Sequence, residues 1–143
     1  MPPEAQGRRL RHALDVRHSS FACGDYLALA RRFGIATVFT DSDRYPAIAD
    51  ITGDFVYARM MRTDASLPEG LAPEAFDQLA ACAHTSRAGH EPTGVPKIAA
   101  AAPQVAPRDV FMLFIGGAKE KAPAAAMALL RRLAITGADG QAR

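Results

Sequence analysis

Hydrophobic and polar residues alternate along the segment from Leu10 to Arg17. One side of this segment carries Leu10, His12, Leu14 and Val16, and the other carries Arg11, Ala13, Asp15 and Arg17. A period of two residues is typical of a β-strand whose faces meet different surroundings. The pattern therefore predicts a strand over 10–17, on which Asp15 and Arg17 point the same way and are close enough to pair.

Three later segments also have the composition of strands. β-Branched and aromatic residues fill 35–40 and the segment from Asp54 to Met60, and an almost unbroken apolar run extends from Asp109 to Ile115. These residue types are enriched in strands. The last run does not alternate, so we expect a strand that is buried on both faces of a parallel sheet.

Apolar residues recur at helical spacing between these strands. The spacing predicts helices over Asp25–Phe33, from Pro73 to about Arg87, and from about Ala122 to Leu133. The connection over 44–53 contains a proline and is too short for a further helix. We find no two-residue hairpin turn between strands. The alternation therefore predicts an α/β fold made of parallel βα units with right-handed crossovers.

Three segments show no periodicity. Residues 1–9 are expected to form a loop or a frayed terminus, 88–108 a long mobile loop rich in proline, glycine and alanine, and 137–143 a disordered tail. With 143 residues, the chain is predicted to form a single domain with a substantial core.

Composition excludes several classes of protein. No apolar run approaches the roughly 18 residues of a membrane-spanning helix, and the first residues lack a secretory apolar stretch, so we expect no membrane partner and a cytoplasmic location. The net charge of +2 does not by itself favour nucleic acid, although it does not exclude it. Cys23 and Cys82 form no CxxC motif and are expected to be buried thiols, with no metal or disulfide.

Polar residues gather where the predicted strands end. Because ligands of parallel α/β folds meet the carboxyl ends of the strands, these residues are the candidate site. The four strand ends supply Asp15, Arg17 and His18, then Asp41 and Asp43, then Tyr57 and Arg59, and finally the Gly116-Gly117 turn followed by Lys119 and Lys121.

The residue types at these ends suit an anion. Two arginines facing a shared cavity bind carboxylate or phosphate through paired N–H donors. Glycines before a helix let backbone N–H groups approach an anion, and lysines beside them add positive charge. His18 and Asp41 are the candidate catalytic groups, and an unperturbed histidine titrates near about pH 6.5. His84 and His90 fall on or beside the opposite face and are not assigned to the site.

Structural roles remain open for each of these residues. Asp15 and Arg17 can form an ion pair within the sheet, and His18 can simply bond to a loop. Asp41 and Asp43 can cap the turn that follows them. The Gly116-Gly117 pair lacks a GxGxxG or Walker pattern, and no Ser/His/Asp, HExxH or EF-hand motif is present. The sequence therefore identifies no metal and leaves any cofactor unknown.

Three segments of the chain resemble the YecE-like family, a bacterial domain family of unknown function. They run from Arg11 to Phe21, from Asp50 to Arg59 and from Phe114 to Ala125, in the family's order. The resemblance implies a TIM-type (β/α) barrel, of which this chain would be the C-terminal half. Arg17, His18, Tyr57 and Arg59 match the family's motifs directly.

The chain departs from the family at three places. The family usually has Glu where Asp15 stands, a Leu-His-Gly-like segment where this chain has Met60-Met61-Arg62, and an Asn-Asn-like strand end where it has Ile115-Gly116. The polar roles at these positions are therefore not carried over from the resemblance.

Together these observations predict an uncharacterised YecE-like protein whose intact form binds a small anionic or phosphorylated ligand at the strand ends. Arg17 and Arg59 would hold the anion, His18 would donate or accept a proton, and Asp15 would orient Arg17. A nucleic-acid-processing barrel is one alternative, and a truncated non-catalytic remnant or interaction module is another. Half a barrel leaves two free strand edges, so we expect self-association or a missing N-terminal half.

Overall fold

A four-stranded parallel sheet forms the centre of the molecule. The structure is a computed structural model that describes residues 2, 4–99 and 105–134. The sheet order is β3-β4-β5-β6, so each strand lies beside its neighbour in the sequence, and every pairing is parallel. The predicted α/β fold with a parallel sheet is therefore confirmed. The strands are β3 Ala13–Leu14, β4 Ala36–Asp41, β5 Phe55–Met60 and β6 Asp109–Phe114.

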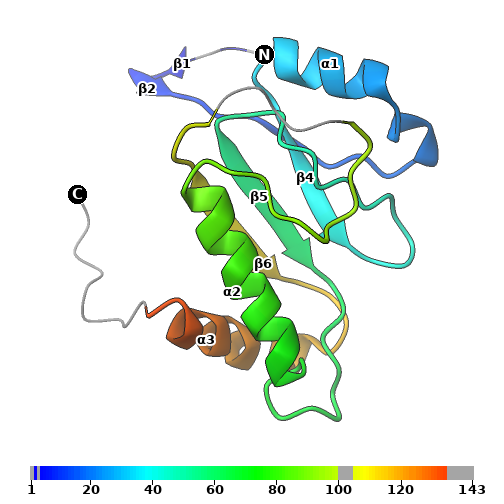
Figure 1. Ribbon diagram of the computed structural model, residues 1–143, viewed down its shortest axis with the longest axis vertical. Helices are drawn as coiled ribbons and strands as arrows, with labels where there is room; N and C mark the ends of the chain where they lie inside the picture. The colour runs from blue at the N-terminus through cyan, green and yellow to red at the C-terminus, as the bar shows by residue number, and fades with distance from the viewer. Residues whose placement is uncertain (1, 3, 100–104, 135–143) are drawn as a thin grey trace.

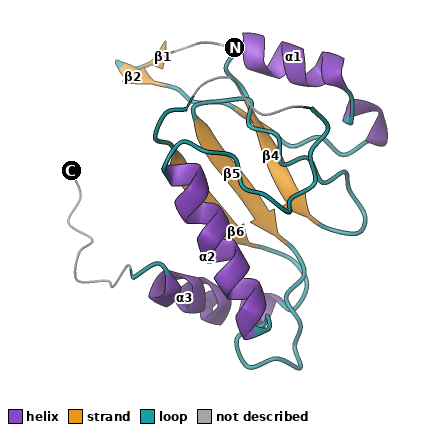
Figure 2. Ribbon diagram, viewed as in Figure 1, coloured by secondary structure: helices purple, strands orange, loops and turns teal. Residues whose placement is uncertain are grey.

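The three predicted helices are present, each within one residue of its expected ends. They are α1 Gly24–Arg32, α2 Pro73–Arg87 and α3 Ala122–Arg132. Short 3-10 turns over Ser19–Phe21 and Lys119–Lys121 precede α1 and α3. The connection between β4 and β5 contains no helix, as expected (Figure 2). Local apolar spacing was therefore sufficient to locate each helix.

The first strand of the sheet is much shorter than predicted. Only Ala13 and Leu14 pair in register with β4, and one more hydrogen bond joins the Ala36 N–H to the His12 carbonyl at 2.9 Å. The prediction over 10–17 was wrong in length because alternation indicates which way side chains point, not whether a partner strand lies alongside. β3 lies at one edge of the sheet.

The segment before β3 forms a small antiparallel ribbon where a loop was expected. β1 (Glu4–Ala5) pairs with β2 (Arg8–Arg9) through a two-residue turn. Both turn residues, Gln6 and Gly7, have positive φ, at 52° and 72°. Such a turn matches the twist of a hairpin and normally has Asn or Asp before the glycine. Because Gln6 stands there instead, the sequence did not predict the hairpin.

One face of the sheet is packed against α2 and α3 (Figure 1). Phe76 and Ala125 are fully buried there, at 0% exposure. Alanines on both helices allow the helix backbones to approach the strands closely. This cluster is the main core and consists of Ala58, Met60, Phe76, Ala80, Phe114, Ala125, Ala128 and Leu129. A smaller cluster places α1 against the chain beyond β3 and consists of Val16, Tyr26, Leu27, Ala30 and Ile48.

The opposite face of the sheet carries aromatic side chains, of which Phe55 is buried and Tyr57 and Phe111 are only partly covered. The Phe111 ring lies 5.9 Å from Phe55 and 6.4 Å from Tyr57, and the Arg11 guanidinium lies 4.9 Å from the Phe55 ring. Phe111 is 40% exposed. The expectation that this strand is buried on both faces was wrong because β6 is an edge strand and the helices pack on the other face.

The long segment between α2 and β6 is tied to the connection that precedes β5. The buried Asp50 carboxylate accepts hydrogen bonds from the Ile98 and Ala99 N–H groups at 2.8 and 2.9 Å. The Ala49 N–H also donates to the Pro96 carbonyl at 2.9 Å. Mobility of 88–108 remains a prediction, but the part up to residue 99 is anchored. Residues 100–104 and the predicted tail 137–143 lie outside the described residues.

The two cysteines differ from the expected pair of buried thiols. Cys23 is exposed just before α1, so this prediction was wrong for Cys23, which lies at the helix cap and not on its packed face. Cys82 is partly buried within α2, and burial raises the pKa of its thiol.

Candidate functional site

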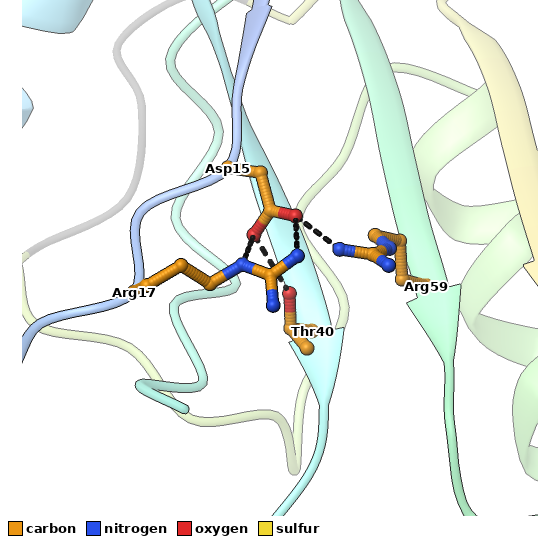
Figure 3. A network of polar contacts seen from close by, with 4 residues as sticks. All are labelled: Asp15, Arg17, Thr40 and Arg59. Atoms are coloured by element: carbon orange, nitrogen blue, oxygen red, sulfur yellow. Dashed lines mark hydrogen bonds and ion pairs between the residues drawn. The ribbon is translucent and has the colours of Figure 1, made fainter. Parts of the chain in front are cut away.

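The Asp15 carboxylate joins two arginines at the carboxyl end of the sheet (Figure 3). Arg17 donates from Nε to Oδ1 at 3.0 Å and from Nη2 to Oδ2 at 2.6 Å, which is a bidentate pair. Arg59 donates from Nη1 to the same Oδ2 oxygen, and the Thr40 hydroxyl donates to Oδ1 at 3.5 Å. We call these four residues the Asp15 cluster.

The strand register explains how residues far apart in the sequence meet in this cluster. Thr40 and Arg59 are direct partners across β4 and β5, and Asp15 follows the end of β3. Thr40 is fully buried at 0% exposure, and its small side chain leaves room for Asp15 to reach across β4 to Arg59. The structure therefore brings together Asp15, Arg17 and Arg59, which were expected at neighbouring strand ends.

The Asp15 cluster has an excess of positive charge. One carboxylate faces two guanidinium groups, so the charged side chains sum to +1. The hydrogen bond from Arg17 to Asp15 raises the pKa of Arg17, which therefore stays charged. Arg17 also lies over the Tyr45 ring at 4.3 Å, which fixes the plane of its guanidinium. Its side chain is 42% exposed, against 21% for Arg59, so an incoming anion has access to Arg17.

A second ion-paired group lies at the end of β4. Arg62 contacts Asp41 through Nε at 2.9 Å and Asp43 through Nη2 at 2.9 Å. Successive side chains of a strand point to opposite faces, so Asp41 leaves β4 on the side opposite Thr40. The contacts therefore place Asp41 in a separate group from Asp15. Burial raises the pKa of Asp41, the Arg62 charge opposes this shift, and Asp43 adds to it.

His18 is held by the turn that follows β3. Its Nδ1 accepts a hydrogen bond from the Ser20 backbone N–H at 3.2 Å and also lies 2.8 Å from the Ser20 hydroxyl. Because a backbone N–H can only donate, Nδ1 is the acceptor and Nε2 carries the proton of the neutral ring. The expected bond to a loop is therefore present, and His18 keeps an exposed Nε2–H donor.

The Gly116-Gly117 turn is packed against Thr63. Gly117 has φ +56°, and a Cβ on it would lie 2.3 Å from the Thr63 carbonyl oxygen. The buried Thr63 hydroxyl donates to the Gly116 carbonyl at 2.9 Å. Close packing is therefore enough to require glycine here. Lys119 is exposed, and none of the contacts described above joins it to the Asp15 cluster.

The similarity of the chain to known proteins agrees with this architecture. A family model described as "Protein of unknown function DUF72" matches residues 4–142. The chain belongs to the DUF72 family. The crystal structure of a DUF72 family protein from Enterococcus faecalis is similar to it, with a TM-score of 0.58 and 13% identity. The match covers 89% of this chain and 48% of that one, so the chain spans about half the length of its structural relative. No similar curated protein was found.

Three residues of this DUF72 chain were missed by the sequence argument. Thr40, Tyr45 and Arg62 contact Asp15, Arg17 and Asp41 respectively. Thr40 and Arg62 lie within two residues of a strand end, so a wider definition of the strand ends would have included both. Tyr45 lies in a loop, and no local pattern indicates that its ring meets Arg17.

Other features of this DUF72 chain lie outside the Asp15 cluster. Within 4–99 and 105–134, no three His, Cys, Asp or Glu side chains are placed to hold a metal ion. In the same parts of the chain no helix is long and apolar enough to cross a membrane. His84 lines a groove of about 610 Å³ between α2, α3 and the β6 edge, away from the Asp15 cluster. Tyr57 lies two residues before Arg59 on the same face and packs beside Phe111.

Proposed function

We propose that this DUF72 chain binds a small anionic ligand, a carboxylate or a phosphate, at the carboxyl ends of its strands. The observation that carries the proposal is the sharing of one carboxylate by two arginines in the Asp15 cluster. The two arginines and the carboxylate together carry a net charge of +1, and Arg59 keeps further N–H groups for a second anion. Arginine recognises both kinds of anion through its planar fork of donors.

The proposed roles divide the cluster into holding and orienting groups. Arg59 and Arg17 bind the anion, and Asp15 with Tyr45 fixes the position of Arg17. His18 offers its Nε2–H as a donor or proton source beside the same strand end. Asp41 is the proposed proton acceptor, supported by a pKa that burial raises, although its contacts place it in the Arg62 group.

We also propose that the sheet belongs to a TIM-type barrel of the YecE-like kind. The parallel order of four strands and the helices on one face support this arrangement. In a barrel the other face lines the interior, which accounts for the aromatic side chains of β5 and β6 there. A second copy or another half would complete the barrel along the β3 and β6 edges. A sharply melting monomer in solution would contradict pairing with a second copy.

The proposed site is tested by an anion titration that is monitored by isothermal titration calorimetry. Inorganic phosphate and succinate are titrated into the full chain and into Arg59→Gln, at constant ionic strength. We expect Arg59→Gln to weaken binding by about tenfold or more, because a charge-assisted hydrogen bond contributes about 1.5–3 kcal/mol.

Arg131→Gln is the matched control because Arg131 pairs with a single acid, Glu69, on the exposed surface of α3. It should leave binding unchanged. Equal affinity of the unchanged chain and Arg59→Gln would exclude the proposed site. Binding to duplex DNA that weakens steeply with salt, with no response to phosphate, would instead favour the nucleic-acid alternative.

A further inference from the structure

A second group of arginines lies at the opposite end of the sheet, where the strands begin. Arg9 belongs to β2, Arg31 to the last turn of α1, and Arg108 directly precedes β6. These three side chains line one hollow of about 400 Å³, together with Asp54 and Gly53. This volume is within the range of small-molecule sites. We call it the Arg31 hollow.

The Arg31 guanidinium is fixed in place while keeping donors unused. Its Nε donates to the Ile51 carbonyl at 3.2 Å, in the loop that leads into β5. Its Nη2 is buried and has no hydrogen-bond partner among the described residues. A buried donor without an acceptor is unfavourable, and a bound oxyanion would supply that acceptor.

The loop that forms the wall of the Arg31 hollow is rigidly held. The Thr52 hydroxyl donates to the Ile35 carbonyl at 2.7 Å and accepts the Thr37 N–H at 2.7 Å. Gly53 passes so close to β4 that a Cβ on it would lie 2.9 Å from the Ala36 nitrogen. The wall is therefore in place before any ligand arrives, which lowers the entropic cost of binding.

The charge of the Arg31 hollow is strongly positive. Its described lining includes three arginines and one aspartate, a formal charge of +2. Arg108 is only 8% exposed. The one acid, Asp54, pairs with Arg9 at 2.8 Å, and both side chains are well exposed, at 48% and 78%. Solvent screens that pair in part, and Asp54 lowers the positive charge that an anion meets in the hollow.

We propose that the Arg31 hollow binds a small oxyanion, either a phosphate ester or a carboxylate, at a site distinct from the Asp15 cluster. Arg31 supplies the charge and the unpaired Nη2 donor, and Ile51, Ala106 and Pro107 give the ligand a short apolar wall. We favour a small anion over a nucleic-acid backbone because the unpaired Nη2 donor of Arg31 is buried.

The experiment is an NMR titration of the full ¹⁵N-labelled chain with inorganic phosphate, and separately with succinate, at constant ionic strength. Binding should shift the amide signals of Gly34, Gly53 and Asp54 saturably. Arg31→Gln should weaken this binding by about tenfold, in line with the loss of one charge-assisted interaction. Response to phosphate alone identifies a phosphate ester as the ligand class, and response to succinate alone identifies a carboxylate.

Two further variants separate a binding role from a structural one. Asp54→Asn removes the one acid among the described residues of the lining and should strengthen binding several-fold, a change that general loosening of the fold would not produce. Arg32 is the exposed neighbour of Arg31 and lies over the Phe33 ring, so Arg32→Gln should leave the affinity unchanged.

The proposal fails if no saturable shifts occur at these amides, if Arg31→Gln binds as tightly as the unchanged chain, or if Arg32→Gln weakens binding equally. Displacement of phosphate by duplex DNA with a steep salt dependence would also overturn it. Arg59→Gln should affect only signals near Asp15, so the two anion sites are tested independently.

Discussion

The two faces of the sheet use the same strands but depend on different interactions. On one face Ala58 and Met60 are buried against α2 and α3, with Phe76 at 0% exposure. On the other, Tyr57 and Phe111 stack loosely and Arg59 binds Asp15. Alternation along β5 therefore separates buried apolar side chains from aromatic and charged ones. The covered face contributes packing energy, and the open face carries the ion pair of Arg59 with Asp15.

The largest expected effect concerns two phenylalanines, one on each face of the sheet. Phe76→Ala should reduce the free energy of unfolding by about 3–5 kcal/mol, because it leaves a cavity in a fully buried site. Phe111→Ala should reduce it by less than about 2 kcal/mol, because 40% of Phe111 is already exposed. Urea denaturation at several protein concentrations measures both. Equal losses would mean that the open face is covered in solution.

Removal of the shared carboxylate should have an intermediate effect. Asp15→Asn leaves the guanidinium groups of Arg17 and Arg59 close together without a negative charge between them and with one acceptor oxygen in place of two. We therefore expect a loss of about 1–3 kcal/mol. Glu69→Gln is the control, because its pair with Arg131 is exposed on both sides and should contribute less than about 1 kcal/mol. If the two variants lose the same stability, the Asp15 cluster does not hold the strand ends together.

The smallest expected effect is a change in pH dependence at Asp41. Because the pKa of Asp41 is higher in the folded chain, folding favours its protonated form. This contribution is fully present at pH below the ordinary carboxyl value and is lost as the pH rises through the raised value. Asp41→Asn cannot ionise, so its melting temperature should vary less with pH across that interval. A steeper dependence in the variant would show that the lowering effect of Arg62 on the pKa of Asp41 outweighs the raising effect of burial.

The sequence was a good guide wherever one local pattern decides the structure. The helix from Pro73 to Arg87 was located at both ends, because its apolar spacing and its first-turn proline agree. The short extent of β3 and the β1–β2 ribbon were not predicted, because strand pairing depends on which other segment of the chain lies beside the strand. Exposed Phe111 was misjudged for the same reason, since an apolar run does not reveal whether its strand is central or at an edge.

The candidate site was predictable in part. Parallel strands end at one edge of a sheet, and this rule alone grouped Asp15, Arg17 and Arg59. The rule does not state which way the last side chain of a strand points, so it placed Asp41 in the same group. It also overlooked the beginnings of the strands, and the Arg31 hollow depends on loops whose paths no periodicity describes.

The buried Asp50 carboxylate has a consequence for how this chain can vary. By accepting the N–H groups of Ile98 and Ala99, it joins the connection before β5 to the one before β6. An insertion in either connection beside this point would separate the carboxylate from both donors and leave a buried charge without partners. The two connections are therefore constrained to evolve as one unit.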